Sequence, residues 1–174
     1  MSTGGVDQTQ AAAAALRFVR DEAGFAQVTT IDRRGYPVTR SMTAFLEDDW
    51  SVSLVQRAAH QRLSQWRANP RTLVSWVGDP APGQTNERPH VFDLGRLPSR
   101  LVAVRGDVEF MPDDWTVRTY RTHLEAQRAA GNTRAPVRTD DKVRAELVGV
   151  IIHPVRVRLE GFGQGPQSFD WTIT

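Results

Sequence analysis

The sequence contains no cysteine and no long apolar run, and it has a single lysine, Lys142, against twenty-one arginines. The absence of cysteine excludes disulfides, thiolate metal sites and cysteine nucleophiles, and it suits a reducing compartment. The longest apolar run near the N-terminus, residues 11–16, is too short for a signal or membrane-spanning segment. We therefore expect a cytoplasmic globular protein without a membrane partner. The preference for arginine over lysine, together with abundant alanine, suggests a GC-rich genome.

Acidic residues are missing from one internal stretch. Residues 50–78 contain no Asp or Glu but carry Arg57, Arg62, Arg67 and Arg71, so this stretch is net +4 in a chain of net +2. A helix expected to begin near residues 58–60 would place Arg62 in its first turn, where the helix dipole disfavours a cation. A bound anion would remove that conflict, because helix N-termini bind anions well. The sequence therefore predicts a phosphate site here.

Most motifs that carry chemistry are also missing. The sequence has no Gly-rich phosphate loop, no G-x-G-x-x-G between a strand and a helix, and no G-x-S-x-G elbow. The histidines, His60, His90, His123 and His153, do not have the spacing of a zinc site, so we expect no metal. A chain with an anion site but no nucleophile or metal box of its own is best interpreted as the host of a reactive cofactor.

Hydrophobic periodicity predicts a mainly β protein with peripheral helices. We expect helices over residues 7–22, 60–69 and 113–130. Six strands are expected, over residues 26–31, 37–46, 50–55, 72–77, 101–111 and 147–159, the last broken at His153-Pro154. The first three should be antiparallel neighbours in one meander, with Gly35 in the first turn and Gly106 at a bend. These strands favour an antiparallel β-barrel. Residues 1–6 are expected to be a flexible tail and 7–174 a single domain with a long irregular loop at 79–99.

Four ordered segments resemble the pyridoxamine 5′-phosphate oxidase-like split β-barrel superfamily, which includes flavin and deazaflavin oxidoreductases. They are a strand ending in Thr30-x-Asp32-x-x-Gly35-x-Pro37, a strand carrying Arg40, a strand over residues 50–55, and the run from Arg62 to Asn69-Pro70-Arg71. The resemblance covers residues 24–78 well and continues loosely through 100–108 and 147–158. It implies a six-stranded split barrel, a homodimer, and a flavin-type ring held against the barrel by its phosphate.

Matched residue by residue, the resemblance assigns the cofactor site to seven positions. Arg40 corresponds to the basic strand residue and Val55 and Gln56 to the rim near the ring. Arg57 lies in the following loop, and His60, Gln61 and Arg62 form the phosphate cluster. An ion pair of Arg40 with Glu47 or Asp49 is the alternative for Arg40. For Arg67 and Arg71 a solvated surface is the better interpretation.

The favoured hypothesis is an oxidoreductase that uses FMN or the deazaflavin coenzyme F420 to move a hydride to or from a small conjugated molecule. His60, Tyr36 and Tyr120 are unranked candidates for a proton donor, and no catalytic residue is assigned. One alternative is a non-catalytic module that binds a flavin or haem for storage or sensing. Pyridoxamine 5′-phosphate oxidase proper is disfavoured, because residues 161–174 lack the Arg/His segment that binds the substrate phosphate. Nucleic-acid binding through Trp66, Trp76 and the arginines is a weaker hypothesis, and we expect no nucleic-acid partner.

Overall fold

The computed structural model describes residues 7–78, 100–163 and 167–173. The expected tail at 1–6 and loop at 79–99 lie outside these residues. The elements in chain order are α1 (Gln8–Asp21), β1 (Ala26–Ile31), β2 (Pro37–Met42), β3 (Phe45–Leu46), β4 (Val52–Arg57), α2 (Gln61–Ala68), β5 (Arg71–Val77), β6 (Leu101–Phe110), α3 (Asp113–Ala129), α4 (Asp140–Glu146), β7 (Leu147–Glu160) and β8 (Ser168–Thr172).

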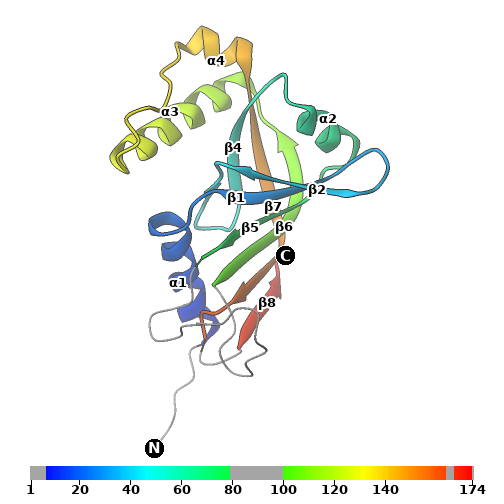
Figure 1. Ribbon diagram of the computed structural model, residues 1–174, viewed down its shortest axis with the longest axis vertical. Helices are drawn as coiled ribbons and strands as arrows, with labels where there is room; N and C mark the ends of the chain where they lie inside the picture. Colours follow the sequence, from blue (N-terminus) through cyan, green and yellow to red (C-terminus); the bar gives the residue numbers. More distant parts are fainter. Residues whose placement is uncertain (1–6, 79–99, 164–166, 174) are drawn as a thin grey trace, which may run out of the picture.

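The strands form one curled antiparallel sheet in the order β2-β1-β5-β6-β7-β4-β3, with β8 pairing to β7 (Figure 1). The mainly β class is confirmed, but the count of six strands is wrong, because the described residues contain eight. The expected strand at 37–46 is divided into β2 and β3. A two-residue strand such as β3 carries no readable period, and β8 follows a glycine-rich run that reads as turn material.

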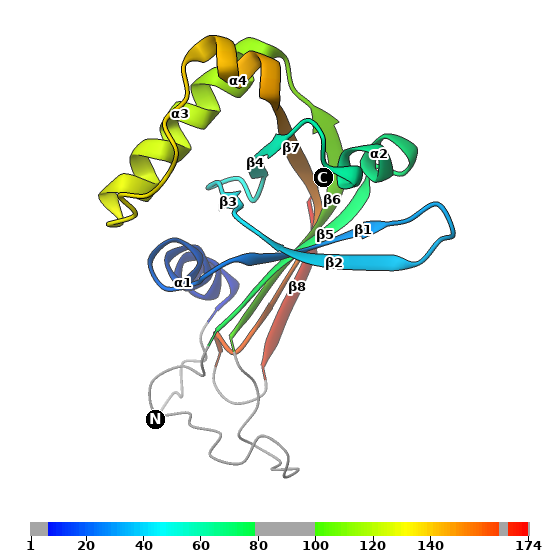
Figure 2. The ribbon, with the colours of Figure 1, turned by 45° about the horizontal axis from the view of Figure 1, so that its top comes forward.

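The three expected helices are present with nearly the expected bounds. Asp7 caps α1 by accepting a hydrogen bond from the Gln10 amide at 2.8 Å. Leu63 and Trp66 are the buried residues of α2 and lie on one side of it. Pro70 disfavours helical backbone at Asn69, so α2 ends before it. The short helix α4 was not expected from the sequence; Thr139 caps it. In both ribbon views α3 and α4 stand out from one end of the sheet, and β4 lies between them and α2 (Figures 1 and 2).

The β1–β2 hairpin forms as expected. The Asp32 carboxylate accepts hydrogen bonds from the amides of Arg34 and Tyr36 at 2.8 and 2.9 Å, and Gly35 has a φ of 86° that favours glycine.

The expected meander of three neighbouring strands forms only in part. β1 pairs with β2, and β3, the end of the expected second strand, pairs with β4, but β3 and β4 lie at the opposite end of the sheet from β2, and β5 takes the free edge of β1. Burial explains the difference. Val52, Ser53 and Leu54 are all buried, so β4 is covered on both faces, unlike a strand at the open end of a hairpin.

The expected break at His153-Pro154 is also wrong. β7 runs through this point for 14 residues, and Pro154 is accommodated by a bulge in the pairing with β6, where the register shifts at Arg105/Gly106. Gly106 marks this irregularity as expected. A Cβ there would collide with the carbonyl oxygen of His153, so only glycine allows the two backbones to approach this closely.

The main core lies inside the curled sheet and beneath α1 and α2, and it includes Val28, Leu54, Trp66, Trp76 and Val104. Trp66 and Trp76 are both about 1% exposed, so neither offers an open stacking surface. A second small cluster of Val117, Val143 and Leu147 joins α3 and α4 to β7. Within the described residues, no helix is long and apolar enough to cross a membrane.

Candidate functional site

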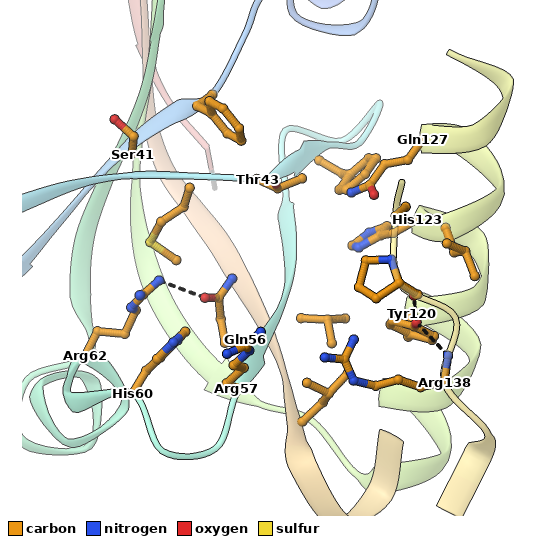
Figure 3. A pocket seen from close by; sticks show the side chains of 18 residues that line it. Ser41, Thr43, Gln56, Arg57, His60, Arg62, Tyr120, His123, Gln127 and Arg138 are labelled. Carbon is orange, nitrogen blue, oxygen red and sulfur yellow. Dashed lines mark hydrogen bonds between the residues drawn. The ribbon is translucent and has the colours of Figure 1, made fainter. Parts of the chain in front are cut away.

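A cleft of about 420 Å³ lies between the end of β4 and α2 on one side and α3 on the other (Figure 3). Its residues come from the chain just before β1, from β2 to β4, from α2 and the turn before it, from α3 and the segment after it, and from the start of β7. They are Phe25, Ser41, Met42, Thr43, Phe45, Val55, Gln56, Arg57, His60, Arg62, Tyr120, His123, Leu124, Gln127, Ala135, Pro136, Arg138 and Leu147. Five of the seven predicted cofactor residues, Val55, Gln56, Arg57, His60 and Arg62, therefore line one cleft.

The end of the cleft formed by β4 and α2, which we call the basic end, is defined by Gln56, Arg57, His60 and Arg62. Arg62 donates a hydrogen bond to Gln56 Oε1 at 2.8 Å, which holds its guanidinium over the cleft (Figure 3). The turn before α2 is fixed by two backbone hydrogen bonds, from the His60 amide to Arg57 O at 3.1 Å and from the Ala58 amide to Glu146 O at 2.8 Å. These two hydrogen bonds fix the backbone from which the side chains of His60 and Arg62 extend.

The cations of the basic end have no acidic partner. Within residues 7–78, 100–163 and 167–173, neither Arg57 nor Arg62 forms an ion pair with a carboxylate. Burial, followed by the nearby charge of Arg40, lowers the pKa of Arg62. Positive charge that is partly desolvated and unpaired is unfavourable, and an anion between these groups would relieve it.

His60 lies at the N-cap of α2 and has no capping hydrogen bond. Its Nδ1 is one of two buried side-chain atoms without a partner in the described chain, the other being Trp66 Nε1. Burial, and then the charges of Arg62 and Arg57, lower the pKa of His60, so its imidazole is neutral at pH 7. A buried donor or acceptor left unpaired costs about 1–3 kcal/mol, which a ligand oxygen on Nδ1–H would recover.

Two predicted residues do not line the cleft. Gln61 is the exposed first residue of α2. Arg40 donates to Thr30 Oγ1 and Gln65 Oε1, both at 3.2 Å, so it joins β2 to α2 behind Arg62. The alternative ion pair of Arg40 with Glu47 or Asp49 does not form.

The other end of the cleft is formed by α3 and the chain that follows it. The Tyr120 hydroxyl donates to Pro136 O and accepts from the Arg138 amide at 3.1 Å. Arg138 is paired with Glu146 at 3.2 Å. Of the three candidate proton donors, His60 and Tyr120 therefore line the cleft, whereas Tyr36 is 67% exposed beside the β1–β2 turn and does not.

His123 is the most enclosed titratable group of the cleft. Its ring stacks on Phe45 with 3.7 Å between centroids and 14° between planes, and its Nε2 lies 2.9 Å from Ser53 Oγ. Burial lowers the pKa of His123 to about 4, so the imidazole is neutral at pH 7. Phe45 and His123 also line a second, larger cavity of about 690 Å³ between α1, β3 and α3.

Reasoning from the sequence did not assign Phe45, Ser53, His123 or Arg138 to the site. A signal was present, because Val117, Tyr120, Leu124 and Gln127 recur at helical spacing with His123 in α3 and mark one face of the helix. The sequence did not predict which strand lies beneath that face. Placing α3 over β4 depends on the pairing of β4 with β7.

Comparison with known proteins identifies the fold. No family model and no curated protein matches the chain. Among solved structures, a haem-binding protein from Mycobacterium smegmatis superposes with a TM-score of 0.63 at 19% identity over 96% of this chain, which spans 60% of that structure. An F420 reductase gives 0.52 at 18% identity over 79% of this chain and 91% of its own. A pyridoxamine 5′-phosphate oxidase-related, FMN-binding protein from Nostoc punctiforme gives 0.57 at 12% identity over 97% and 98%.

The chain therefore shares the split β-barrel fold of these solved structures. At these identities the comparisons describe the split barrel and not its chemistry, which must be argued from the cleft. The cleft combines the cationic side chains of the basic end with an apolar and aromatic wall that includes Val55, Phe45 and Tyr120. The unpartnered His60 Nδ1 and the unpaired arginines fit a phosphate, and the wall fits a planar ring.

Proposed function

We propose that this split-barrel protein is an oxidoreductase that uses FMN or coenzyme F420 to transfer a hydride to or from a small conjugated organic substrate. The single observation that carries the proposal is the basic end of the cleft. There Arg57, Arg62 and the unpartnered His60 Nδ1 meet at the start of α2, and no carboxylate of residues 7–78, 100–163 or 167–173 pairs with either arginine. A phosphate is the simplest group that satisfies all three.

Each side chain has a distinct part in this proposal. Arg62, fixed by Gln56, and Arg57 bind the phosphate together with the first amides of α2. The ring of His60, neutral at pH 7, turns so that its buried Nδ1 donates to a phosphate oxygen. Val55 and Phe45 line the cleft against the ring and exclude water from its face. The bound cofactor supplies the hydride chemistry, and the chain orients it.

The neighbouring structures support this proposal at the level of the superfamily, since they include an F420 reductase and an FMN-binding protein. The printed name of one neighbour, a haem-binding protein, supports a second candidate, a non-catalytic haem-binding module. One observation favours it: burial keeps the His60 imidazole neutral, as an iron ligand must be, and the arginines beside it could pair with propionates.

We further propose that the protein works as a cytoplasmic homodimer, because an open sheet leaves edges and an apolar face to be covered. Its substrate would be a small molecule. Sedimentation equilibrium at micromolar concentration tests the dimer, and a monomer would contradict it.

The decisive experiment is titration of the purified protein with FMN, F420 and haem, each followed by its absorption spectrum. We expect micromolar or tighter binding of FMN or F420, and then turnover with quinones or enones that exceeds the rate in buffer. Preferential haem binding without turnover would favour the haem-binding module. Binding of none of the three would contradict both functions.

A further inference from the structure

A hydrogen-bonded chain of three side chains connects the cleft to the outside of the molecule. His123 Nε2 lies 2.9 Å from Ser53 Oγ, and Ser53 Oγ donates to Glu47 Oε1 at 2.9 Å. Ser53 is 3% exposed, whereas Glu47 is exposed in the turn after β3. A buried histidine is thereby linked to solvent through a buried hydroxyl. The proposed function does not use this connection.

We propose that Glu47, Ser53 and His123 form a proton relay that takes a proton from a ligand in the cleft at His123 Nδ1 and releases it at Glu47. This deepens the proposed function and rests on it for the substrate. The proposed relay implies that the substrate is an alcohol or amine that carries a C–H bond beside its O–H or N–H. It also implies that the reaction is a dehydrogenation of this substrate.

The direction of the relay follows from counting hydrogens. Ser53 has one hydroxyl hydrogen, and it is donated to the Glu47 carboxylate. Ser53 Oγ can then only accept from His123, so the imidazole proton is on Nε2. A neutral ring protonated on Nε2 has a lone pair on Nδ1. His123 therefore meets a ligand as a proton acceptor.

His123 Nδ1 is accessible to a ligand. It makes no hydrogen bond among the described residues, and it is not one of the two buried polar atoms that lack a partner. It is therefore open to one of the two cavities that His123 lines. Figure 3 shows the ring reaching from α3 into the cleft. The charged and titratable groups that share these cavities are Arg20, Glu47, Arg57, His60, Arg62, Arg118, Tyr120 and Arg138.

The chemistry balances as follows for an alcohol. The C–H hydrogen leaves with its electron pair to an oxidised flavin-type ring, the O–H proton leaves to His123 Nδ1, and the C=O bond forms. At the same time the Nε2 proton passes to Ser53 Oγ and the Ser53 proton passes to Glu47, which releases it to solvent. Because burial disfavours the imidazolium, His123 cannot hold a second proton, and transfer in concert avoids that charge. To reset the chain, Glu47 takes a proton from solvent and passes it to Ser53, Ser53 returns a proton to Nε2, and Nδ1 loses its proton to water in the cleft.

The first test is the tautomer of His123 in the full chain without cofactor, measured by long-range ¹H–¹⁵N NMR. We expect the Nε2–H tautomer from pH 5.5 to 8. Ser53→Ala should produce a mixture of tautomers, because Nε2 loses its acceptor. Glu109→Gln is the matched control, since it alters another carboxylate that contacts a histidine, His153, at 2.6 Å on the β6–β7 face. It should leave His123 unchanged. An Nδ1–H tautomer in the parent protein, or no change in Ser53→Ala, would overturn the relay.

The second test uses protein loaded with FMN or F420 and a panel of cyclic secondary alcohols and amines. We expect Ser53→Ala to slow cofactor reduction roughly 10²- to 10⁴-fold, the usual contribution of general base catalysis, with little change in substrate KM. Glu109→Gln should react at the parent rate. Equal rates in the parent and Ser53→Ala, or reduction by none of the panel, would overturn the relay. Failure to bind either cofactor would instead contradict the proposed function. The tautomer measurement needs no cofactor and would still test the relay.

Discussion

The two ends of the cleft differ in how far their charged groups are paired. At the basic end, Arg57 and Arg62 have no acidic partner in the described part of the chain, and burial lowers the pKa of Arg62. At the α3 end, Arg138 is paired with Glu146, and His123 is neutral and hydrogen-bonded. The comparison teaches that one end is incomplete without an anion, whereas the other is complete in itself. Under the proposed function an anion binds at the first end, and a neutral group that can exchange a proton binds at the second.

The largest expected effect concerns how each end is anchored. α2 is held by Trp66, which is 1% exposed in the main core, whereas α3 is held by Val117, 6% exposed in the small cluster. Trp66→Ala should lower the free energy of unfolding by about 3–5 kcal/mol. Val117→Ala should lower it by about 1–2 kcal/mol, because it removes fewer buried methyl groups. Urea denaturation measures both. Equal losses would mean that the two ends are anchored alike.

The next effect is a pH dependence at the α3 end. The pKa of His123 is about 4 in the folded protein against a usual 6.5, so the unfolded chain binds more protons between these values. Stability should therefore fall as pH falls through this window, by roughly 3 kcal/mol in total. Urea denaturation at pH 7 and pH 4.5 measures it. His123→Gln, which does not titrate, should remove most of this slope, and a variant with the parent's slope would contradict the assignment.

Reversing a charge at the basic end should abolish the anion site. Arg62→Glu should weaken binding of FMN or F420 at least about 100-fold, about 2.7 kcal/mol, with a change in unfolding free energy of about 1 kcal/mol or less. Arg67→Glu is the matched control, because Arg67 lies on the same helix but over Phe110, 4.8 Å from its ring centroid. It should change affinity less than about threefold. Spectroscopic titration measures both, and unchanged affinity in Arg62→Glu would place the phosphate elsewhere.

The smallest effect tests whether His60 acts as a neutral donor. His60→Ala should weaken cofactor binding about tenfold, the contribution of one hydrogen bond. Because burial and the neighbouring arginines lower its pKa, the loss should be independent of pH between 7 and 8.5. His60→Asn, which keeps a donor, should recover part of it. A loss as large as that of Arg62→Glu would indicate a charged or iron-binding role.

The sequence predicted the elements that depend on local pattern. The grouping of Arg57, His60 and Arg62 in one cleft was among them, because these residues are close in the chain and their placement needs only the end of β4 and the start of α2. That this group binds an anion stays a prediction. The α3 end was not predicted, because His123 and Ser53 are 70 residues apart and meet only through the pairing of β4 with β7. Pro154 misled the strand assignment for a related reason, since the bulge that accommodates it depends on Gly106 of β6.

The length of β7 has a consequence for how the molecule opens. β7 pairs with β4 over its first six residues, with β6 from Val150 to Glu160 and with β8 over its last five. Residues 150–152 and 156–160 are therefore flanked on both sides, so neither part can detach without breaking two ladders. The amides of these two parts should exchange with deuterium only when the whole sheet unfolds. A ligand held at Gln56, whose strand partner is Val148, would then slow exchange as far away as β8, with no movement of any atom between them.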